Sequence, residues 1–231
     1  MYLSRVRVAT EGLDRNALLA LMAGDAYGNH QLLWQMFTDQ EERNFLFRQE
    51  IEQEQLSPDS DPRGLPLFYV LSEEPPTSVP GLLQAETKTF MPKLQQGDRL
   101  AYRLRANPTI ARKQLGRERS VRHDVLMDAK KQCKQAGVTS AADVQAQMNK
   151  AASTWLMQRA ENAGFELAAE PQISGYRQHA IRRKGQDIRF SSTDYEGVLT
   201  VSAPEQFAKI LYRGLGRSRA FGCGLMLIRR T

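Results

Sequence analysis

The chain has 231 residues, of which 41% are hydrophobic and 25% are charged, and its formal net charge is +6. This length admits one large domain or two small ones, and the composition is that of an ordinary globular protein. There is no run of apolar residues long enough for a transmembrane helix, and Cys133 and Cys223 alone make neither a disulfide framework nor a zinc site. Because the N-terminus also lacks the apolar middle of a signal peptide, we expect a cytoplasmic protein.

The charge is distributed unevenly along the chain. Residues 1–100 hold 9 basic and 15 acidic residues, whereas residues 101–231 hold 23 basic and 11 acidic residues. A half with a charge of +12 indicates a polyanion-binding surface joined to a half with another task. Since the basic residues accompany no apolar amphipathic helix, nucleic acid is favoured as the partner over a membrane surface.

The first half predicts one ferredoxin-like unit. Apolar residues at helical spacing predict a helix over 15–22 and another over 27–37, with Asp25 as the N-cap of the second. The predicted strands are 2–9, 44–51, 66–72 and 82–96. Residues 52–66 are a polar, proline-containing loop, and prolines within 73–81 leave only a stunted helix there. The order is that of a split βαβ unit whose second helix is missing or reduced.

The second half repeats this order. A helix is expected from Thr139 or Ser140 to about Asn162, and a second begins at Pro204 and ends at Arg213. The predicted strands are 100–105, a hairpin of 165–179 and 181–190, then 195–201 and 225–229, while 107–134 is expected to be basic and irregular. The prediction is therefore an α+β chain of two tandem ferredoxin-like (RRM-like) domains with antiparallel sheets, at 1–96 and 97–231.

A glycine-rich segment lies near the C-terminus. Gly214, Gly216, Gly222 and Gly224 bracket a stretch that carries Arg217 and Arg219, follows directly after Arg213 and holds no acidic residue. Glycines allow positive φ and close approach of the backbone to a ligand, and N–H groups with nearby arginines suit phosphates. The segment is neither a Walker loop nor a dinucleotide fingerprint, because no Gly-Lys-Ser/Thr and no βα unit follow. A helix stop, a turn and a final strand is the alternative interpretation.

Tyr27 and His30 are the candidate catalytic residues. They are three positions apart on a predicted helix, so both rings project from one face, and histidine suits proton transfer at neutral pH. The alternative is a surface histidine near a helix start. We expect His123 to be solvated or to face RNA, rather than to act as a catalyst, and His179 to be a strand-end residue or a phosphate contact. No His, Cys and carboxylate residues have metal-ligand spacing, and the sequence predicts no metal or cofactor.

Basic side chains gather in three runs of the second half, with few acidic residues between them. They predict a continuous cationic path for RNA phosphates. The aromatic pattern of a standard RRM sheet is absent, which favours binding across a helical stem over stacking of splayed bases. The predicted RNA-binding residues are Arg103, Arg105, Arg112, Lys113, Arg182, Arg183, Lys184, Gly214, Gly216, Arg217, Ser218, Arg219, Gly222 and Gly224.

Six segments, in this order, resemble the CRISPR repeat-processing endoribonucleases of type I-E systems. They are Met1-Tyr-Leu-Ser-Arg-Val6, Tyr27-x-x-His30-Gln-Leu-Leu-Trp-Gln-Met-Phe37, Asn44-Phe-Leu-Phe-Arg48, Tyr102-Arg-Leu-Arg-Ala-Asn-Pro108, Tyr195-Glu-Gly-Val-Leu-Thr-Val201 and Gly214-Leu-Gly-Arg-Ser-Arg-Ala-Phe-Gly-Cys-Gly224. One such motif is weak evidence, but six over nearly the whole chain are strong. The chain departs from the family by an insertion at about residues 11–24 and a proline-rich loop at 55–66, neither of which touches these motifs.

The resemblance implies metal-independent cleavage of the CRISPR repeat at the 3′ base of its hairpin, by attack of a 2′-hydroxyl. It places His30 as general base or general acid and Tyr27 as an orienting residue, and it leaves the cation that stabilises the phosphoryl oxygens unassigned. It also implies that the hairpin around Arg182 to Lys184 lies in the major groove of the RNA. The mature crRNA would stay bound, with the protein a subunit of the Cascade antiviral complex.

Two other functions are compatible with parts of the sequence. One is an RNA-binding scaffold on the same fold, in which His30 is incidental. The other is a small-molecule enzyme that uses the glycine-rich segment for a nucleotide, and the charge of +12 on the second half argues against it.

Overall fold

The structure is a computed structural model that describes residues 1–9, 26–37, 42–51, 65–113, 120–183 and 186–231. The chain forms two compact units. The first contains Met1–Pro92 and Arg219–Leu225, and the second contains Lys93–Ser218 and Met226–Thr231. The predicted boundaries, 1–96 and 97–231, differ from this division mainly in Arg219–Leu225, which returns to the first unit.

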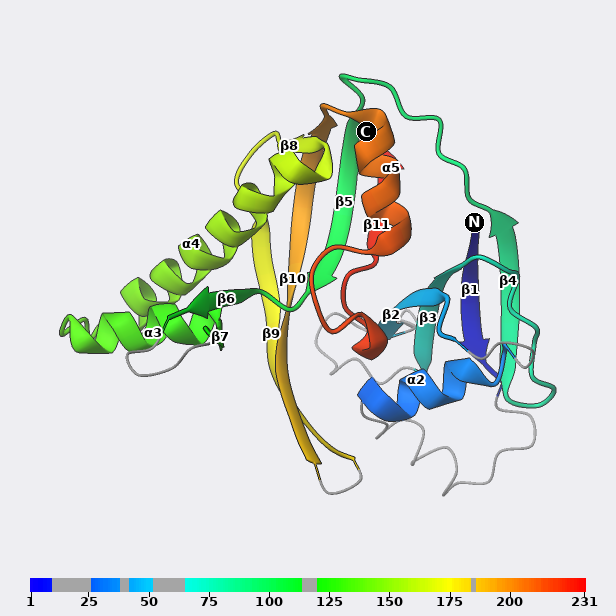
Figure 1. The fold of residues 1–231 in the computed structure, drawn as a ribbon, viewed down its shortest axis with the longest axis horizontal. Helices are drawn as coiled ribbons and strands as arrows, with labels where there is room; N and C mark the ends of the chain where they lie inside the picture. Colours follow the sequence, from blue (N-terminus) through cyan, green and yellow to red (C-terminus); the bar gives the residue numbers. More distant parts are fainter. Residues whose placement is uncertain (10–25, 38–41, 52–64, 114–119, 184–185) are drawn as a thin grey trace, which may run out of the picture. The chain divides into compact units, whose positions relative to one another are not determined.

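The first unit is a four-stranded antiparallel sheet with helix α2 (Ala26–Trp34) (Figure 1). Its strands are β1 (Tyr2–Val8), β2 (Phe45–Ile51), β3 (Pro66–Ser72) and β4 (Leu83–Thr89), in the spatial order β2-β3-β1-β4. This order is that of a ferredoxin-like unit, as the sequence predicts. Residues 73–82, all described, form no helix between β3 and β4. The helix expected over 15–22, the Asp25 cap and most of the 52–66 loop lie outside the described residues.

Alternation along the strands makes the core of this unit. Val6 and Val8 on β1, Phe45 and Phe47 on β2, and Phe68 on β3 are all buried, and Leu33 of α2 is buried with them. Since neighbouring residues of a strand point to opposite faces, these positions form one apolar face of the sheet that α2 covers. The helix ends at Trp34, earlier than the predicted Phe37, although Met36 and Phe37 remain buried in the following turn.

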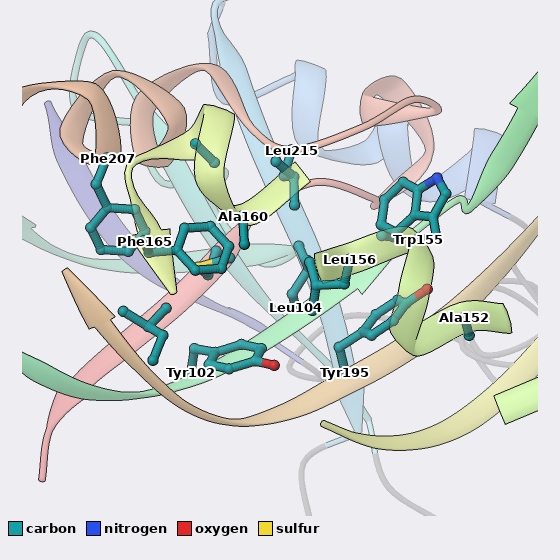
Figure 2. Close-up of a cluster of buried hydrophobic side chains, with 14 of the residues drawn as sticks. Tyr102, Leu104, Ala152, Trp155, Leu156, Ala160, Phe165, Tyr195, Phe207 and Leu215 are labelled. Carbon is teal, nitrogen blue, oxygen red and sulfur yellow. The ribbon is translucent and has the colours of Figure 1, made fainter. Parts of the chain in front are cut away.

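The second unit has the same strand order. Its sheet is formed by β5 (Arg99–Ala106), β8 (Phe165–Leu167), β10 (Gln186–Val201) and β11 (Met226–Arg230), antiparallel in the order β11-β5-β10-β8. Helices α4 (Ala141–Ala160) and α5 (Pro204–Arg213) close the core, in which Trp155, Phe165 and Phe207 pack against the sheet (Figure 2). Ser140 caps α4 as expected, and Gly164 has the left-handed conformation (φ 79°) just after the 3-10 turn η1 (Glu161–Ala163). Two tandem ferredoxin-like domains are thus confirmed.

A long hairpin extends from this sheet. Strand β9 (Gln172–Arg183) pairs with β10. Of the strands predicted at 181–190 and 195–201, residues 181–183 belong to β9, whereas 186–190 and 195–201 belong to β10. Strand β10 is a single strand of sixteen residues whose register is irregular between Ser192 and Asp194. No Gly or Pro separates Phe190 from Asp194, so nothing in the backbone ends the strand there. The prediction of separate strands was wrong at this point.

The expectation of an irregular segment over 107–134 was also wrong. Strands β6 (Thr109–Arg112) and β7 (Val121–Asp124) pair antiparallel, and α3 (Val125–Gln135) packs beside α4 (Figure 1). Asp124 starts α3 because its carboxylate accepts hydrogen bonds from the N–H groups of Leu126 and Met127 at 2.8 and 3.0 Å. Val125, Leu126 and Cys133 give α3 a buried face that the surrounding charges obscure in the sequence.

Candidate active site and nucleic-acid interface

His30 lies in an aromatic cluster of the first unit. Its ring centroid is 5.6 Å from that of Trp34, 5.8 Å from that of Phe45 in a stacked arrangement, and 6.5 Å from that of Phe47. The imidazole is half-buried, and strand β2 supplies the two phenyl rings. Such packing holds the ring in a defined orientation, as a group that transfers a proton requires. A freely solvated histidine has no such surroundings.

Helix α2 is tied to the sheet by a buried amide pair. Asn29 is 2% exposed, and its Nδ2 donates to Oε1 of Gln49 on β2 at 2.7 Å. Tyr27 lies one turn before His30 and is half-buried, and its hydroxyl accepts from Nε2 of Gln31 at 2.8 Å. The hydroxyl therefore has a set direction on the same helix as the imidazole. The i, i+3 spacing predicted from the sequence places both rings on one helix face.

The C-terminal part of the glycine-rich segment packs on this same unit. The 3-10 turn η2 (Arg219–Phe221) contacts α2 and β2. Gly222 follows with φ 81°, and a Cβ there would lie 3.2 Å from Cε2 of Phe47. Its backbone conformation and its closeness to an aromatic ring both require glycine. Gly224 has φ 95° and is buried.

Arg219 brings a second cation close to Arg43. The Nη1 of Arg43 donates to the carbonyl of Phe45 at 2.6 Å, so this guanidinium is fixed beside the strand that carries the aromatic cluster. Burial lowers the pKa of Arg43, and the charge of Arg219 lowers it further. Two like charges held near each other favour an anion between or beside them. The sequence analysis missed Arg43, which immediately precedes the Asn44 motif and has no pattern of its own.

The other residues of the glycine-rich segment belong to the second unit. Gly214 and Gly216 have φ of 79° and 88°, and a Cβ on Gly216 would lie 3.4 Å from Cη2 of Trp155. Arg217 is exposed, and Ser218 has φ 56°, an uncommon value for a residue with a side chain. The hydroxyl of Ser218 accepts from Nδ2 of Asn107 at 2.7 Å. These glycines therefore shape a turn that presents Arg217 and Ser218.

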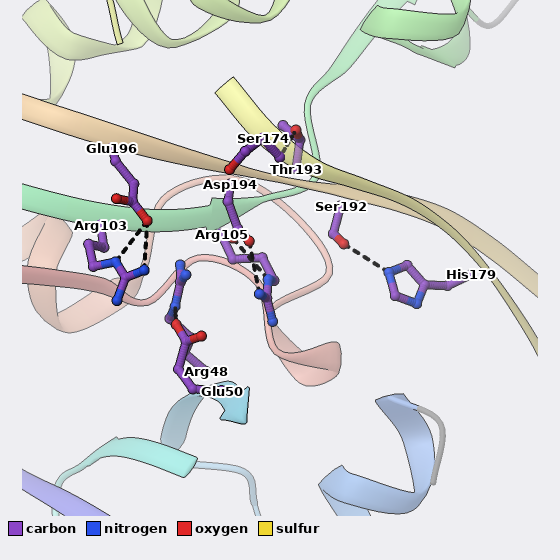
Figure 3. Close-up of polar contacts among 10 residues, drawn as sticks. All are labelled: Arg48, Glu50, Arg103, Arg105, Ser174, His179, Ser192, Thr193, Asp194 and Glu196. Carbon is purple, nitrogen blue, oxygen red and sulfur yellow. Dashed lines mark hydrogen bonds and ion pairs between the residues drawn. The ribbon is translucent and has the colours of Figure 1, made fainter. Parts of the chain in front are cut away.

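Three of the predicted RNA-binding arginines are ion-paired within the protein. Arg103 pairs with Glu196 at 2.7 Å and Arg105 with Asp194 at 2.9 Å, both across β5 and β10 (Figure 3). Arg112 pairs with Asp128 of α3. The cationic surface of the second half is thus partly neutralised by carboxylates on neighbouring elements. Lys113 is exposed.

Figure 3 also shows a buried pair on the first unit. Arg48 is 1% exposed and its guanidinium pairs with Glu50, two residues along the same face of β2. The motif residue Arg48 therefore has a structural place in the sheet.

The hairpin residues are described in part. Arg182 and Arg183 form the end of β9, and Lys184 lies outside the described residues. His179 on β9 stacks on Phe190 of β10 with ring centroids 4.4 Å apart, and its Nε2 is 2.8 Å from Oγ of Ser192 (Figure 3). Burial, followed by the charges of Arg105 and Arg177, lowers the pKa of His179. The lowered pKa favours the neutral form of this imidazole.

In the described part of the chain, no group of three or more His, Cys, Asp or Glu side chains could hold a metal ion. None of the helices in the described ranges is long and apolar enough to cross a membrane.

The chain is similar over its whole length to known proteins. It is 26% identical to the CRISPR system Cascade subunit CasE of Escherichia coli strain K12, over 98% of both chains. The CRISPR endoribonuclease Cse3 bound to a 19-nucleotide RNA matches 99% of this chain and 100% of its own, with a TM-score of 0.67 and 25% identity. The CRISPR-associated protein Cas6e from Escherichia coli K-12 matches 100% of both chains, with a TM-score of 0.63 and 24% identity.

The sequence model of one protein family, described as CRISPR associated protein, matches residues 1–230. The match includes the aromatic cluster of the first unit and the basic second unit. The chain belongs to this family of CRISPR associated proteins.

Proposed function

We propose that this protein is an endoribonuclease that cleaves CRISPR repeat RNA at the 3′ base of its hairpin and then stays bound to the mature crRNA as a subunit of a Cascade complex. The observation that carries the proposal is the placement of His30 and Tyr27 on one helix in a chain that matches an RNA-bound CRISPR endoribonuclease from end to end. The reaction needs no metal or other cofactor, and it takes place in the cytoplasm.

The chemistry is a transesterification at phosphorus. The 2′-oxygen of the nucleotide before the scissile bond forms a bond to phosphorus while the bond to the departing 5′-oxygen breaks. The 2′-hydroxyl loses a proton and the 5′-oxygen gains one, which gives a 2′,3′-cyclic phosphate and a 5′-hydroxyl. His30 serves one of these proton transfers, as general base or general acid, and the hydroxyl of Tyr27 orients the reacting groups.

The negative charge on the phosphoryl oxygens requires a fixed cation. Arg43 and Arg219 are held near each other in the unit that carries His30, and Arg43 is anchored to the carbonyl of Phe45, whose ring stacks on the imidazole. Cations that are already in place when the charge develops stabilise the transition state without reorganisation. We assign this role to the Arg43–Arg219 pair.

The second unit binds the RNA hairpin. The β9–β10 hairpin carries Arg182, Arg183 and Lys184 toward the major groove of the stem, and the other basic residues of the unit, including Arg217 and Lys113, contact phosphates. Since each phosphate contact releases counterions, affinity falls as salt rises. Retention of the product makes the protein close to a single-turnover enzyme.

The test uses the cognate repeat hairpin RNA in EDTA with three proteins, the wild type, His30→Ala and Gln35→Ala. Gln35 follows α2 and is exposed, so its variant controls for changes near the helix. RNA binding and cleavage are measured on the same samples, and the product ends are mapped by phosphatase sensitivity. We expect the wild type and Gln35→Ala to cut once and leave a cyclic or 3′-phosphate end, while His30→Ala binds equally and does not cut.

Other outcomes separate the alternatives. Equal cutting by the wild type and His30→Ala would remove His30 from the mechanism. Binding without cutting by all three proteins would make the chain an RNA-binding scaffold. Loss of cutting in EDTA, restored by a divalent cation, would overturn the metal-independent reaction.

A further inference from the structure

A cavity of about 670 Å³ lies within the second unit. It is lined by the turn after β5, strand β7, the β9–β10 hairpin and the turn before η2, and the residues that matter most are Asn107, Arg122, His179, Phe190, Arg217 and Ser218. Its volume falls in the range of small-ligand sites, about 300–1,000 Å³. Asn107 and Ser218 come from two of the segments that resemble the family, and the cleavage chemistry uses neither of them.

Asn107, which lines this cavity, has a buried acceptor that is unsatisfied. The residue is 5% exposed, its Nδ2 is engaged with Ser218, and its Oδ1 has no hydrogen-bond partner among the described residues. A buried acceptor without a partner is unfavourable and is uncommon in folded proteins. The partner on the amide side, Ser218, itself has a left-handed backbone (φ 56°), and strained residues gather at ligand sites. The site therefore suits a ligand that donates an N–H group.

The rim of the cavity is cationic. Arg122 on β7 and Arg217 in the turn are both exposed and line the same cavity. The carboxylate of Asp124, which also lines it, accepts from the first N–H groups of α3 and from the hydroxyl of Tyr176 at 2.8 Å. Because the helix N-terminus and this hydroxyl already compensate its charge, the cavity retains an attraction for anions.

One wall is aromatic. The rings of His179 and Phe190 are stacked 4.4 Å apart with 11° between their planes, and both are half-buried. The hydrogen bond between His179 and Ser192 fixes the imidazole, and its lowered pKa favours the neutral form. Planar side chains of this kind are the usual surfaces against which unpaired bases pack.

We propose that this cavity binds one unpaired ribonucleotide of the RNA, with its base against the His179–Phe190 wall, an N–H group of the base donated to Oδ1 of Asn107, and its phosphate beside Arg122 and Arg217. A bare phosphate offers only acceptors to Asn107, and a paired base has its N–H groups engaged in the stem. The ligand therefore joins a base to an anion. The proposal rests on the proposed function in taking the unpaired nucleotide from the repeat RNA.

The test compares two RNAs in the His30→Ala background, the repeat hairpin with short unpaired segments on both sides and the same hairpin without them. Binding constants are measured over a salt series for the parent, Asn107→Ala, Arg122→Gln and Arg217→Gln. Arg99→Gln is the matched control, since Arg99 is exposed at the start of β5 and lies outside the cavity. Free nucleoside monophosphates and a short single-stranded RNA are competitors that separate a nucleotide of a chain from a free one.

We expect the unpaired segments to strengthen binding by the parent, and Asn107→Ala to lose on the order of tenfold for the flanked RNA only, as for one hydrogen bond to a buried acceptor. Each arginine variant should lower the salt slope by about 0.7, the value for a phosphate contact in a single strand. Arg99→Gln should match the parent. Competition by the single-stranded RNA, with little competition by the monophosphates, would show that the bound nucleotide is part of an RNA strand and not a free nucleotide.

The proposal is overturned if the unpaired segments add no affinity, or if the variants weaken both RNAs equally. If the parent binds neither hairpin, the proposed function fails, and the short single-stranded RNA then decides the cavity separately. If the short single-stranded RNA binds the parent and Arg122→Gln loses this binding, the proposed site stands. If this RNA does not bind the parent, the proposed site is rejected. Because the two arginines are exposed, these variants decide the matter even if Asn107→Ala is unstable.

Discussion

Arg43 and Arg219 are joined by no sequence pattern, yet the fold of the first unit holds them near each other. Arg43 precedes β2, and Arg219 begins η2 at the other end of the chain. Keeping two cations together is unfavourable unless an anion compensates them, which is why the charge of Arg219 contributes to lowering the pKa of Arg43 after the effect of burial. Under the proposed function, the transferring phosphate of the RNA would be such an anion.

Neutralising these arginines should therefore slow the chemical step more than it weakens binding. For Arg219→Gln and for Arg43→Gln we expect single-turnover cleavage to fall by about 10²–10³-fold, as for the loss of one fixed donor to a developing charge. Arg7→Gln removes an equal charge from an exposed ion pair on β1 and should leave the rate unchanged. Cleavage rates at saturating protein would be compared with binding constants. An equal loss in rate and binding for all three variants would assign the pair to general attraction of RNA.

At the residue scale the sequence predicts what depends on local spacing. Tyr27 and His30 share a helix face because they are three positions apart, and this follows from the sequence alone. The Asn107–Ser218 hydrogen bond joins residues separated by 111 positions, and the acceptor left on Asn107 arises from that packing. A buried asparagine and an exposed one look alike in a sequence, so this part of the site required the structure.

At the scale of elements, Gly164 ends the helical run of α4 and η1 where the chain turns into β8. It has φ 79°, and a Cβ there would lie 2.5 Å from the carbonyl oxygen of Ala203 and 2.8 Å from the backbone nitrogen of Phe207. Both contacts are with backbone, which cannot move aside as a side chain can. Gly137, after α3, has a similar φ of 75°, but nothing lies within 4 Å of the Cβ position.

Alanine variants of Gly137 and Gly164 separate the energy of the left-handed conformation from that of the steric clash. Gly137→Ala should lower the free energy of unfolding by about 1 kcal/mol, the energy of placing a side chain in this region. Gly164→Ala should lower it by several kcal/mol, since the start of α5 must also shift. Urea denaturation of both variants measures the difference. Equal values would show that the α4–β8 turn and the start of α5 adjust without strain.

The elements that the sequence predicts are those with clear stops. Ser140 and Gly164 bound α4, and Pro204 begins α5, because caps and imino acids act locally. The charges of residues 107–134 instead obscured β6, β7 and α3, although Asp124 followed by Val-Leu-Met is an N-cap before an apolar start. High charge marks exposed faces and does not exclude regular structure.

At the scale of the whole chain, the two units share one strand order while their charges differ. The order follows from repeated β-α-β-β patterns, so the sequence predicts it well. The return of Arg219–Leu225 to the first unit follows from contacts of η2 with α2 and β2 and from the fit of Gly222 against Phe47. The order of elements alone cannot assign so short a segment to the first unit, because its sequence has no pattern that distinguishes it from a loop.

The packing of Arg219–Leu225 in the first unit predicts what happens when the chain is cut between the two units. A protease site introduced at Pro92–Lys93, in the exposed connection after β4, would separate residues 1–92 from the rest of the chain. The second fragment still carries Arg219–Leu225, whose packing belongs to the first unit, so the two fragments should elute together in gel filtration after cleavage. Two domains joined only by a linker would separate instead.

The contact can be weakened without changing the cut. Gly222→Val places a branched side chain at φ 81° and against Phe47, where the Cβ position alone is already 3.2 Å from Cε2 of the ring. We expect the cleaved Gly222→Val protein to separate into its fragments at concentrations where the cleaved parent remains whole. Gly97→Val, at an equally left-handed glycine with open space around it, controls for strain alone and should stay associated. Separation of the cleaved parent would show that Arg219–Leu225 contributes little to holding the first unit, and the assignment of Arg219 to the chemistry of His30 would weaken with it.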